Sequence, residues 1–330
     1  MTIEPSTRVI KADSEAAAAA ARCLAAGGLV AFPTETVYGL GADAQDGIAV
    51  ARLYDAKGRP AFNPLIAHVP DLGAARKLAR FDAMAERLAT ALWPGPLTLV
   101  LPKAPGCAVA ELATAGLDSV AVRLPDHPVA RGILTAFGRP VVAPSANRSG
   151  HVSPTTAQHV LADLHGRIDL IVDGGATPVG VESTIVSCLG EPALLRPGGV
   201  PRAAIEDALG HALAEAPSQD GADEGEASLA PGQLASHYAP RTALRLDATS
   251  VAPGEALLAF GTQAPAGATP VRMLNLSARG DLIEAAANLF SHLRVLDAAG
   301  ACAIAVMPVP HEGLGEAIND RLTRAAAPRP

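Results

Sequence analysis

The sequence predicts a protein with two α/β domains, the larger of which is built on a mixed β-sheet. The chain has 330 residues, about twice the length of an average domain. Apolar runs of strand length alternate with segments of helical periodicity, which is the pattern of an α/β fold. Two strand-like runs, 183–189 and 192–198, are separated by only Gly190 and Glu191. So short a connection joins antiparallel strands, so the sheet cannot be purely parallel.

The first 213 residues contain most of the predicted elements. An alanine-rich helix at 14–26 starts after Asp13 or Ser14 as N-cap and ends at Gly27 and Gly28. The apolar run 29–32 follows as a buried strand. Further helices are expected at 47–57, 71–91, 128–137, 154–165 and 201–213, and further strands at 65–69, 97–102, 119–125, 140–145, 170–175, 183–189 and 192–198.

A second, smaller domain is predicted after a polar segment. Residues 214–232 are acidic and rich in Ala, Gly, Ser and Pro, a composition typical of a linker without fixed structure. The sequence is therefore divided into a larger domain at 1–213, an acidic flexible linker at 214–240 and a small α/β C-terminal domain at 241–330. In the last of these, strands are expected at 242–248, 255–261, 271–277 and 302–308, and helices at 281–299 and 314–325.

Composition and charge exclude several classes of protein. Residues 1–213 contain 18 basic and 20 acidic side chains, residues 241–330 contain 8 of each, and residues 214–240 contain 5 acidic side chains and no Lys or Arg. This balance disfavours direct nucleic-acid binding. No apolar run of about 18 residues predicts a membrane span, and the N-terminus lacks the layout of a signal peptide.

The four cysteines are scattered, without a CxxC spacing. They are expected to be reduced, mostly buried thiols of a cytoplasmic protein, and not ligands of a structural zinc ion.

No common nucleotide or hydrolase motif is present. The sequence has no GxxxxGK[ST], GxGxxG, GxSxG or HExxH. A nucleotide would therefore have to be bound in a less common way.

The segment FPTETVYGLGADA (32–44) is the first candidate for a binding site. It places Thr34, Glu35, Thr36 and Tyr38 after a buried strand, where open α/β sheets bind ligands. The alternative is an ordinary strand-to-helix loop with glycines in its turns.

The segment KGRPAFNPL (57–65) is the second. Lys57 ends a predicted helix, and Arg59 lies in a turn stiffened by two prolines. Such a pair of cations suits a polyphosphate or a carboxylate, because arginine gives bidentate contacts and lysine a point charge. The alternative is that both side chains only cap the helix C-terminus.

The segment APSANRSGHVSP (143–154) is the third. It leads from a strand into a helix that we expect Ser153 to cap, with Pro154 at its first position. Hydroxyl groups and free N–H groups at a helix start can bind phosphate. A well-capped helix with no ligand is the alternative.

Single polar residues on predicted strands complete the candidates. Arg123 lies on an otherwise apolar strand, which requires a ligand or a partner such as Asp126. Ser183 and Arg196 belong to the predicted hairpin. His68 ends the strand 65–69 and is either functional or an ordinary satisfied histidine.

In order, the motifs PTETVYGLG, KGRPxxNPL, VAVRLPDHP, PSAN, ESTIV and RPG resemble those of the YrdC-like domain. The segment APGQLASHYAP (230–240) and the domain after it resemble the long, two-domain members of the threonylcarbamoyl-AMP synthase family. The core motifs depart from the pattern only at Ser119, where a threonine is common. The resemblance implies a YrdC-like twisted mixed sheet with flanking helices, whose concave side forms a basic cleft.

The resemblance also implies a nucleotidyltransferase. It would form threonylcarbamoyl-AMP and pyrophosphate from L-threonine, bicarbonate or CO₂, and ATP with Mg²⁺. The product would serve the N6-threonylcarbamoyladenosine modification of tRNA and would pass to the tRNA threonylcarbamoyl-transferase complex. No tightly bound organic cofactor and no metal site on the protein are implied.

Site residues follow from the same motifs. The residues implied for threonine are Thr36, His68, Arg123, the backbone at Ala143, and Ser183. Those implied for ATP are Lys57, Arg59, Asn63, Ser119, Ser145, Asn147, Ser153, Arg196 and Tyr238, with Lys57 and Arg59 also catalytic. Residues 214–232 are expected to be mobile, and 233–240 to close over the nucleotide as a lid.

Three other functions remain as alternatives. A YrdC-like module could bind RNA without catalysis, which the acidic balance disfavours. A carbamoyl-AMP-forming enzyme usually has zinc-finger segments, and no paired cysteines occur here. A regulatory protein is suggested only by the second domain.

Overall fold

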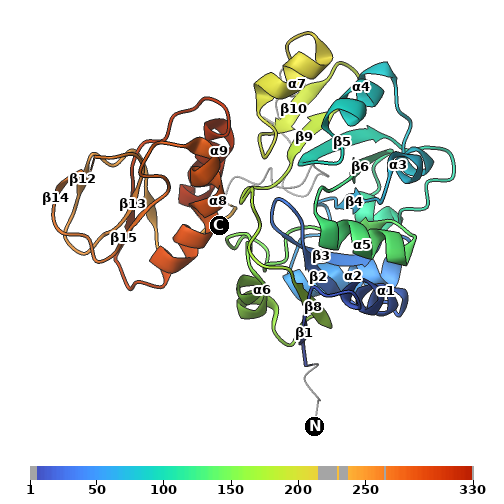
Figure 1. Cartoon of the computed structure of the whole chain (residues 1–330), viewed down its shortest axis with the longest axis horizontal. Coiled ribbons are helices and arrows are strands. Elements are labelled where there is room, and N and C mark those ends of the chain that lie inside the picture. Colours follow the sequence, from blue (N-terminus) through green and yellow to red (C-terminus); the bar gives the residue numbers. More distant parts are fainter. Residues whose placement is uncertain (1–5, 215–228, 230–236, 264, 329–330) are drawn as a thin grey trace.

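The computed structural model describes residues 6–214, 229, 237–263 and 265–328. Within these ranges the chain forms two bodies, a larger one coloured blue to yellow and a smaller one coloured orange to red (Figure 1). Each body has its own β-sheet, of ten and four strands. The segments 215–228 and 230–236 lie outside the described residues, so the predicted mobility of the linker is not addressed.

The larger body is built on a mixed sheet, as predicted. Its strand order is β1-β8-β2-β3-β7-β4-β6-β5-β9-β10. The sheet contains both parallel pairs (β1–β8, β8–β2, β4–β6, β5–β9) and antiparallel pairs, and β9 and β10 form the predicted hairpin. The strands are β1 Arg8–Lys11, β2 Val30–Pro33, β3 Tyr38–Asp43, β4 Ile66–His68, β5 Leu97–Pro102, β6 Ser119–Arg123, β7 Val141–Val142, β8 Leu170–Asp173, β9 Thr184–Ser187 and β10 Ala193–Arg196.

Helices cover one face of this sheet more completely than the other. The helical elements are α1 Ala16–Ala25, α2 Gly47–Lys57, α3 Leu72–Leu78, α4 Ala83–Leu92, the 3₁₀ helix η1 Glu111–Thr114, α5 Pro128–Phe137, α6 Ala157–Leu164 and α7 Arg202–Leu209. Residues of α1 and α5 share a core with β2 and β8. Strands β4, β5, β6, β9 and β10 contribute a small separate cluster that contains no helical residue: Ile66, Val100, Ala121, Ile185 and Leu195. This less covered region is where the site lies.

Several predicted boundaries are wrong for local reasons. The predicted helix 71–91 is two helices, because Ala79 bridges to Lys103 and Asp82 then caps a new helix at Ala85 N. The helix predicted from Ser153 begins at Ala157 with Thr156 as N-cap. The reason is that Pro154 O accepts a hydrogen bond from Tyr38 N, which keeps this segment beside β3.

Strand β3 was not predicted, since the segment 32–44 was interpreted as a binding loop or an ordinary loop. Only its first residues form a turn, and Tyr38–Asp43 pairs with both β2 and β7. The expectation of mostly buried cysteines is also wrong, because only Cys188 is buried and Cys302 is exposed.

The smaller body is a second α/β unit. Strands β11 Leu244–Arg245, β16 Ile304–Val306, β13 Ala256–Ala259 and β15 Met273–Asn275 form a parallel sheet in this order. The short strands β12 Ser250–Val251 and β14 Ala266–Gly267 pair separately. Helices α8 Leu282–Asp297 and α9 Gly315–Ala326 lie on the side that faces the larger body (Figure 1).

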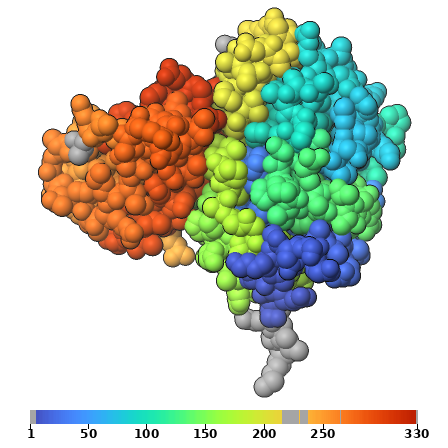
Figure 2. Space-filling view, viewed as in Figure 1, coloured from blue at the N-terminus to red at the C-terminus, as the bar shows by residue number. Residues whose placement is uncertain are grey.

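The two bodies are in close contact (Figure 2). The core of the smaller body includes Val37, Val152 and Val181 from the larger one. Gly180 has a positive φ of 78°, and a Cβ added to it would overlap the main chain of Ala286 in α8. The contact is therefore main chain against main chain, and only glycine fits there. None of the described helices is long and apolar enough to cross a membrane.

Candidate active site

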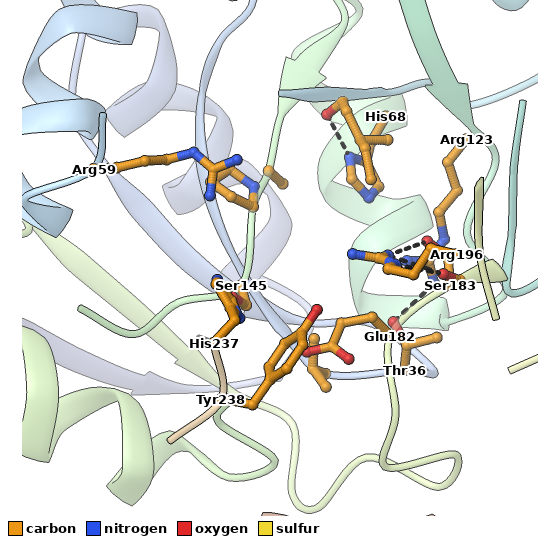
Figure 3. Close-up of a pocket in the computed structure, with 14 residues that line it drawn as sticks. Thr36, Arg59, His68, Arg123, Ser145, Glu182, Ser183, Arg196, His237 and Tyr238 are labelled. Carbon is orange, nitrogen blue, oxygen red and sulfur yellow. Dashed lines mark hydrogen bonds between the residues drawn. The ribbon is translucent and has the colours of Figure 1, made fainter. Parts of the chain in front are cut away.

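A small cavity of about 50 Å³ lies over β4 and β6, at the open part of the large sheet (Figure 3). Its walls are formed by residues from the N-terminal and C-terminal parts of the larger body's sequence, and by the segment that leads into the smaller body. The lining residues are Thr36, Val37, Arg59, Ile66, His68, Arg123, Ala143, Pro144, Ser145, Glu182, Ser183, Arg196, His237 and Tyr238.

All five residues expected to bind threonine line this cavity: Thr36, His68, Arg123, Ala143 and Ser183. The alternation of side chains along strands explains part of this grouping. Ile66 and His68 are two residues apart on β4, and Arg123 ends β6 directly beside His68. Ser183 immediately precedes β9.

Arg123 is buried and held by the turn between β2 and β3. Its Nη2 donates to Glu35 Oε1 at 2.5 Å and to Thr36 Oγ1 at 3.0 Å. The alternative that the Asp126 carboxylate pairs with it is wrong, since Asp126 contributes its backbone N–H to Glu35 Oε2. Arg123 Nε is buried and meets no acceptor among the described residues. A buried donor of this kind is suited to an acceptor on a ligand.

His68 is neutral at physiological pH. Its Nδ1 lies 3.1 Å from Ile66 O. Burial, together with the nearby charge of Arg123, lowers its pKa to about 3. The ring therefore adds no positive charge to the cavity.

Four of the nine residues expected to bind ATP also line the cavity: Arg59, Ser145, Arg196 and Tyr238. The other five are buried without lining it: Lys57, Asn63, Ser119, Asn147 and Ser153. Among these, Asn63 Oδ1 and Asn147 Oδ1 have no hydrogen-bond partner in the described part of the chain.

Lys57 supports the cavity wall from behind. Its Nζ donates to Ser145 O at 2.6 Å and to Asn147 O at 2.5 Å. Burial and the neighbouring Arg59 lower its pKa well below the usual value. The alternative, that Lys57 and Arg59 only cap the C-terminus of α2, does not account for these bonds, because the Lys57 ammonium donates to carbonyl groups of another segment. The left-handed Gly58 closes the helix with its own N–H.

Arg59 extends from the turn after α2 toward the cavity, on the opposite side from Arg123 and Ser183 in Figure 3. Its Nε and Nη2 donate to the carbonyl oxygens of Asn63 and Pro64, at 3.3 and 3.1 Å. Burial lowers its pKa to about 10, so it remains charged at neutral pH. Among the described residues no carboxylate pairs with it.

Arg196 reaches the cavity because β10 is irregular. Leu195 packs with Ile66 on the cavity side of the sheet, so Arg196 would point away from it in a regular strand. The pairing of β10 with β9 shifts register between Leu194 and Arg196, and a bulge re-aims a side chain in this way. Arg196 Nη2 then donates to Ser183 O at 2.9 Å.

The glycine of the RPG motif allows this approach. A Cβ added at Gly198 would overlap the main chain of Glu182 and Ser183. Gly198 therefore lets the end of β10 lie directly against the segment that precedes β9.

Three polar residues at the cavity were assigned no ligand in the sequence analysis: Glu35, Glu182 and His237. Glu35 was named only within the candidate segment 32–44, and His237 lies within the predicted lid 233–240. Glu35 and Glu182 lie inside the motifs PTET and ESTIV, so their position was a usable signal. Glu182 accepts hydrogen bonds from Ser153 Oγ and from Arg321 Nε of α9. His237 lies beside Tyr238, and burial, together with four nearby basic side chains, lowers its pKa well below the usual value.

Tyr238 connects the cavity to the smaller body. It is buried, adopts a left-handed φ of 61°, and stacks on Phe290 of α8 with 5.8 Å between ring centroids. The guanidinium of Arg321 lies 5.0 Å from the centre of its ring. The Tyr238 hydroxyl is buried and has no partner among the described residues.

Two family models match the chain. The model described as "Telomere recombination" matches residues 22–198, and the model of the C-terminal domain of threonylcarbamoyl-AMP synthase matches residues 200–327. The chain belongs to the threonylcarbamoyl-AMP synthase family. The resemblance inferred from the motifs is thus confirmed, including the two-domain form.

Relatives in this family match almost the whole chain. The threonylcarbamoyl-AMP synthase of Bacillus subtilis is 41% identical over 326 residues, covering 94% of this chain and 93% of its own. That of Pyrococcus abyssi is 42% identical over 319 residues, covering 92% of each. The crystal structure of P. abyssi Sua5 complexed with L-threonine superposes with a TM-score of 0.87 at 38% identity, covering 97% of this chain and 98% of that one.

Proposed function

We propose that this protein forms threonylcarbamoyl-AMP and pyrophosphate from L-threonine, bicarbonate or CO₂, and ATP, for the threonylcarbamoyl modification of tRNA. This is the activity for which its family is named. The observation that supports it best is that one cavity joins Arg123 and Ser183 to Arg59 and Arg196. An amino-acid carboxylate and a nucleotide phosphate can therefore be bound side by side.

We assign the threonine end of the cavity to Thr36, His68, Arg123, Ala143 and Ser183. The unpartnered Nε of Arg123 would donate to the substrate carboxylate. Neutral His68 would leave the substrate amine without a competing cation beside it. The ammonium group would lose one proton to water, and the free amine would then combine with CO₂. A second proton leaves the nitrogen to water as the N–C bond forms, which gives the carbamate.

The second step joins the carbamate to the nucleotide. A carbamate oxygen attacks the α-phosphorus of ATP, and the bond from this phosphorus to the pyrophosphate oxygen breaks. No covalent bond to the protein is required, so positioning and charge neutralisation provide the rate acceleration. Arg59 and Arg196 would stabilise the charge that develops on the phosphates.

The remaining residues of the proposed ATP site do not line the cavity and would support the residues that do, or contact parts of ATP outside it. Lys57 fixes the carbonyl groups of Ser145 and Asn147, and would position Ser145 for the nucleotide. Asn63 and Asn147 each have an unpartnered side-chain oxygen that a ligand donor could satisfy. Ser119 lies on the cavity face of β6, two residues before Ala121, and would meet a part of ATP that extends beyond the cavity.

Mg²⁺ would enter with ATP as part of the substrate. The described residues contain no group of three or more His, Cys, Asp or Glu side chains able to hold a metal. Glu182 is the acidic residue that lines the cavity, and its carboxylate is already bound by Ser153 and Arg321. Among the described residues, the cavity lining therefore offers no free carboxylate to a metal ion.

ATP requires a rearrangement around Tyr238. The cavity of about 50 Å³ is far smaller than ligand sites in proteins, which are roughly 300–1,000 Å³. His237 and Tyr238 would move aside and then pack against the phosphates, with the Tyr238 hydroxyl as a donor. The rest of the proposed lid, residues 233–236, lies outside the described residues.

The proposed division of the chain stays as the sequence predicts it: 1–213 catalytic, 214–240 linker and lid, 241–330 a small α/β domain. Acyl adenylates hydrolyse readily, so we also propose that the product passes to the tRNA threonylcarbamoyl-transferase complex in the cytoplasm.

The test is incubation of the full chain with ATP, L-threonine and bicarbonate. We expect equal amounts of pyrophosphate and a threonylcarbamoyl adduct detected by mass spectrometry. Pyrophosphate release that needs carbamoyl phosphate in place of threonine and bicarbonate would instead favour the carbamoyl-AMP-forming alternative. RNA binding without pyrophosphate release would favour a binding module.

A further inference from the structure

Among the described residues, Glu35 is the one acidic side chain that pairs with the arginine we assign to threonine, Arg123. Both of its oxygens are occupied, Oε1 by Arg123 Nη2 at 2.5 Å and Oε2 by the backbone N–H of Asp126 at 3.0 Å. Its own carbonyl oxygen accepts from Val179 N, close before Ser183. Glu35 and Arg123 are both buried, with side chains 8% and 5% exposed. The pair is thus fixed from three directions and shielded from water.

The arginine on the other side of the cavity has a different environment. Arg59 donates to the backbone carbonyl oxygens of Asn63 and Pro64, and no carboxylate among the described residues pairs with it. The two cations therefore differ in net charge: Arg59 is uncompensated, and Arg123 is neutralised by Glu35.

This difference in net charge between the two arginine sites favours ligands of different charge at each site. A polyphosphate carries several negative charges, so it is attracted to an uncompensated guanidinium and repelled by a carboxylate beside a neutralised one. Free threonine is a zwitterion of net charge zero, so Glu35 does not repel it as a whole. Its carboxylate can still accept from Arg123 Nε, which meets no acceptor among the described residues.

We propose that Glu35 is a specificity-determining positioning residue, which reserves Arg123 for the amino acid and excludes the phosphates of ATP and pyrophosphate from it. The proposal rests on the assignment of Arg123 to threonine made above. It predicts that a cavity lined by three arginines does not bind a second polyphosphate in place of its amino acid. The sorting acts through Arg123, without contact between Glu35 and the substrate.

The test uses inorganic pyrophosphate as the probe, titrated calorimetrically into the full chain. The wild type should bind one pyrophosphate. Glu35→Gln, which removes the charge and keeps the size of the side chain, should bind a second, and this second one should displace L-threonine. Removing the repulsion and freeing one charge-assisted donor should strengthen pyrophosphate competition against threonine by about ten-fold or more.

Two variants separate charge from fold. Glu35→Asp keeps the charge and shortens the reach, so it should still exclude the second pyrophosphate although threonine binds more weakly. Glu255→Gln is the matched control, because Glu255 is also buried and also accepts from one arginine, Arg245, and one backbone N–H, that of Ala252. It should change neither stoichiometry nor competition.

The outcomes are distinct. A second pyrophosphate in Glu35→Gln that is lost again in the Glu35→Gln, Arg123→Ala double variant supports the inference. One pyrophosphate in every variant, with threonine undisturbed, overturns it. Because the stoichiometry is measured without threonine or ATP, it gives an answer even if the wild type forms no threonylcarbamoyl-AMP, which is the result that would reject the proposed function.

Discussion

Arg321 of helix α9 and Glu182 beside the cavity form an ion pair between the two bodies, with 2.8 Å between Nε and Oε2. Both side chains are buried, at 0% and 8% exposure. Glu182 also accepts from Ser153, and Arg321 also lies over the ring of Tyr238. A residue 139 positions away in the sequence therefore fixes the wall of the proposed active site. The smaller body is in this sense part of the site.

The first prediction concerns this pair. Arg321→Met leaves the Glu182 carboxylate buried without its cation, and breaking a buried pair in this way costs about 3–5 kcal/mol of unfolding free energy. The control is Arg202→Met, which removes another ion pair between the bodies, with Glu316, whose side chains are 42% and 32% exposed. That loss should be about 1 kcal/mol or less. Urea unfolding measures both.

The double variant Arg321→Met, Glu182→Gln tests the mechanism of this loss. Because the uncompensated charge is gone, the double variant should be more stable than the sum of the two single losses predicts. Equal losses for Arg321→Met and Arg202→Met would contradict the importance of the buried pair.

The second prediction separates Arg59 from Lys57. Arg59→Ala removes a charge-assisted contact to phosphate, so kcat/KM for ATP should fall by about ten- to a hundred-fold. Its Tm should fall less than that of Lys57→Met, because the bonds from Arg59 to the carbonyl groups of Asn63 and Pro64 are longer, at 3.3 and 3.1 Å. Lys57→Met removes the donor to two buried carbonyl groups, so it should lower both activity and Tm. Steady-state kinetics and thermal unfolding of the two variants give the comparison. A Lys57→Met variant as stable as the wild type would show that the carbonyl contacts are unimportant.

The third prediction concerns Arg123. Arg123→Ala should raise the KM for threonine at least about ten-fold more than the KM for ATP, because it removes a contact to the amino acid alone. L-serine lacks one methyl group and should be discriminated by about 10–200-fold in the wild type. Equal shifts in both KM values would contradict the assignment.

The fourth prediction concerns pH. The pKa of His68 is about 3 in the folded protein and about 6.5 in the unfolded chain. The unfolded state thus binds more protons below pH 6.5, so the unfolding free energy decreases as pH falls through this range. His68 should contribute about 2 kcal/mol of the loss between pH 7 and pH 5. Urea unfolding at both pH values should show a smaller loss for His68→Gln than for the wild type, and identical losses would refute the contribution.

Elements with strong local patterns could be predicted from the sequence. The strand at 97–102 and the helix at 128–137 have the predicted bounds, because each is a continuous or amphipathic apolar pattern with a proline or glycine at its end. Strand β3 could not be predicted in this way, because Gly39 and Gly41 resemble turn residues. In the sheet they are needed for space, since a Cβ at Gly41 would overlap the ring of Phe32.

Site residues could be predicted only where they belong to a motif that is continuous in the sequence. Arg123 and Ser183 were selected from their motifs. Asp126, close in sequence, was the alternative partner considered for Arg123, whereas the partner in the structure is Glu35. Arg321 carries no local signal, because its function depends on a contact that forms only when the two bodies pack.

The contact of Gly180 with α8 limits how the enzyme can open. The main chains of the two bodies meet there without side chains between them, two residues before Glu182. A hinge motion that separates the two bodies would break this main-chain contact and displace Glu182 and Ser183 at the same time. Substrate entry is therefore expected to depend on a local movement of His237 and Tyr238, while the two bodies keep their relative positions. The rate of this local movement would set an upper limit on turnover.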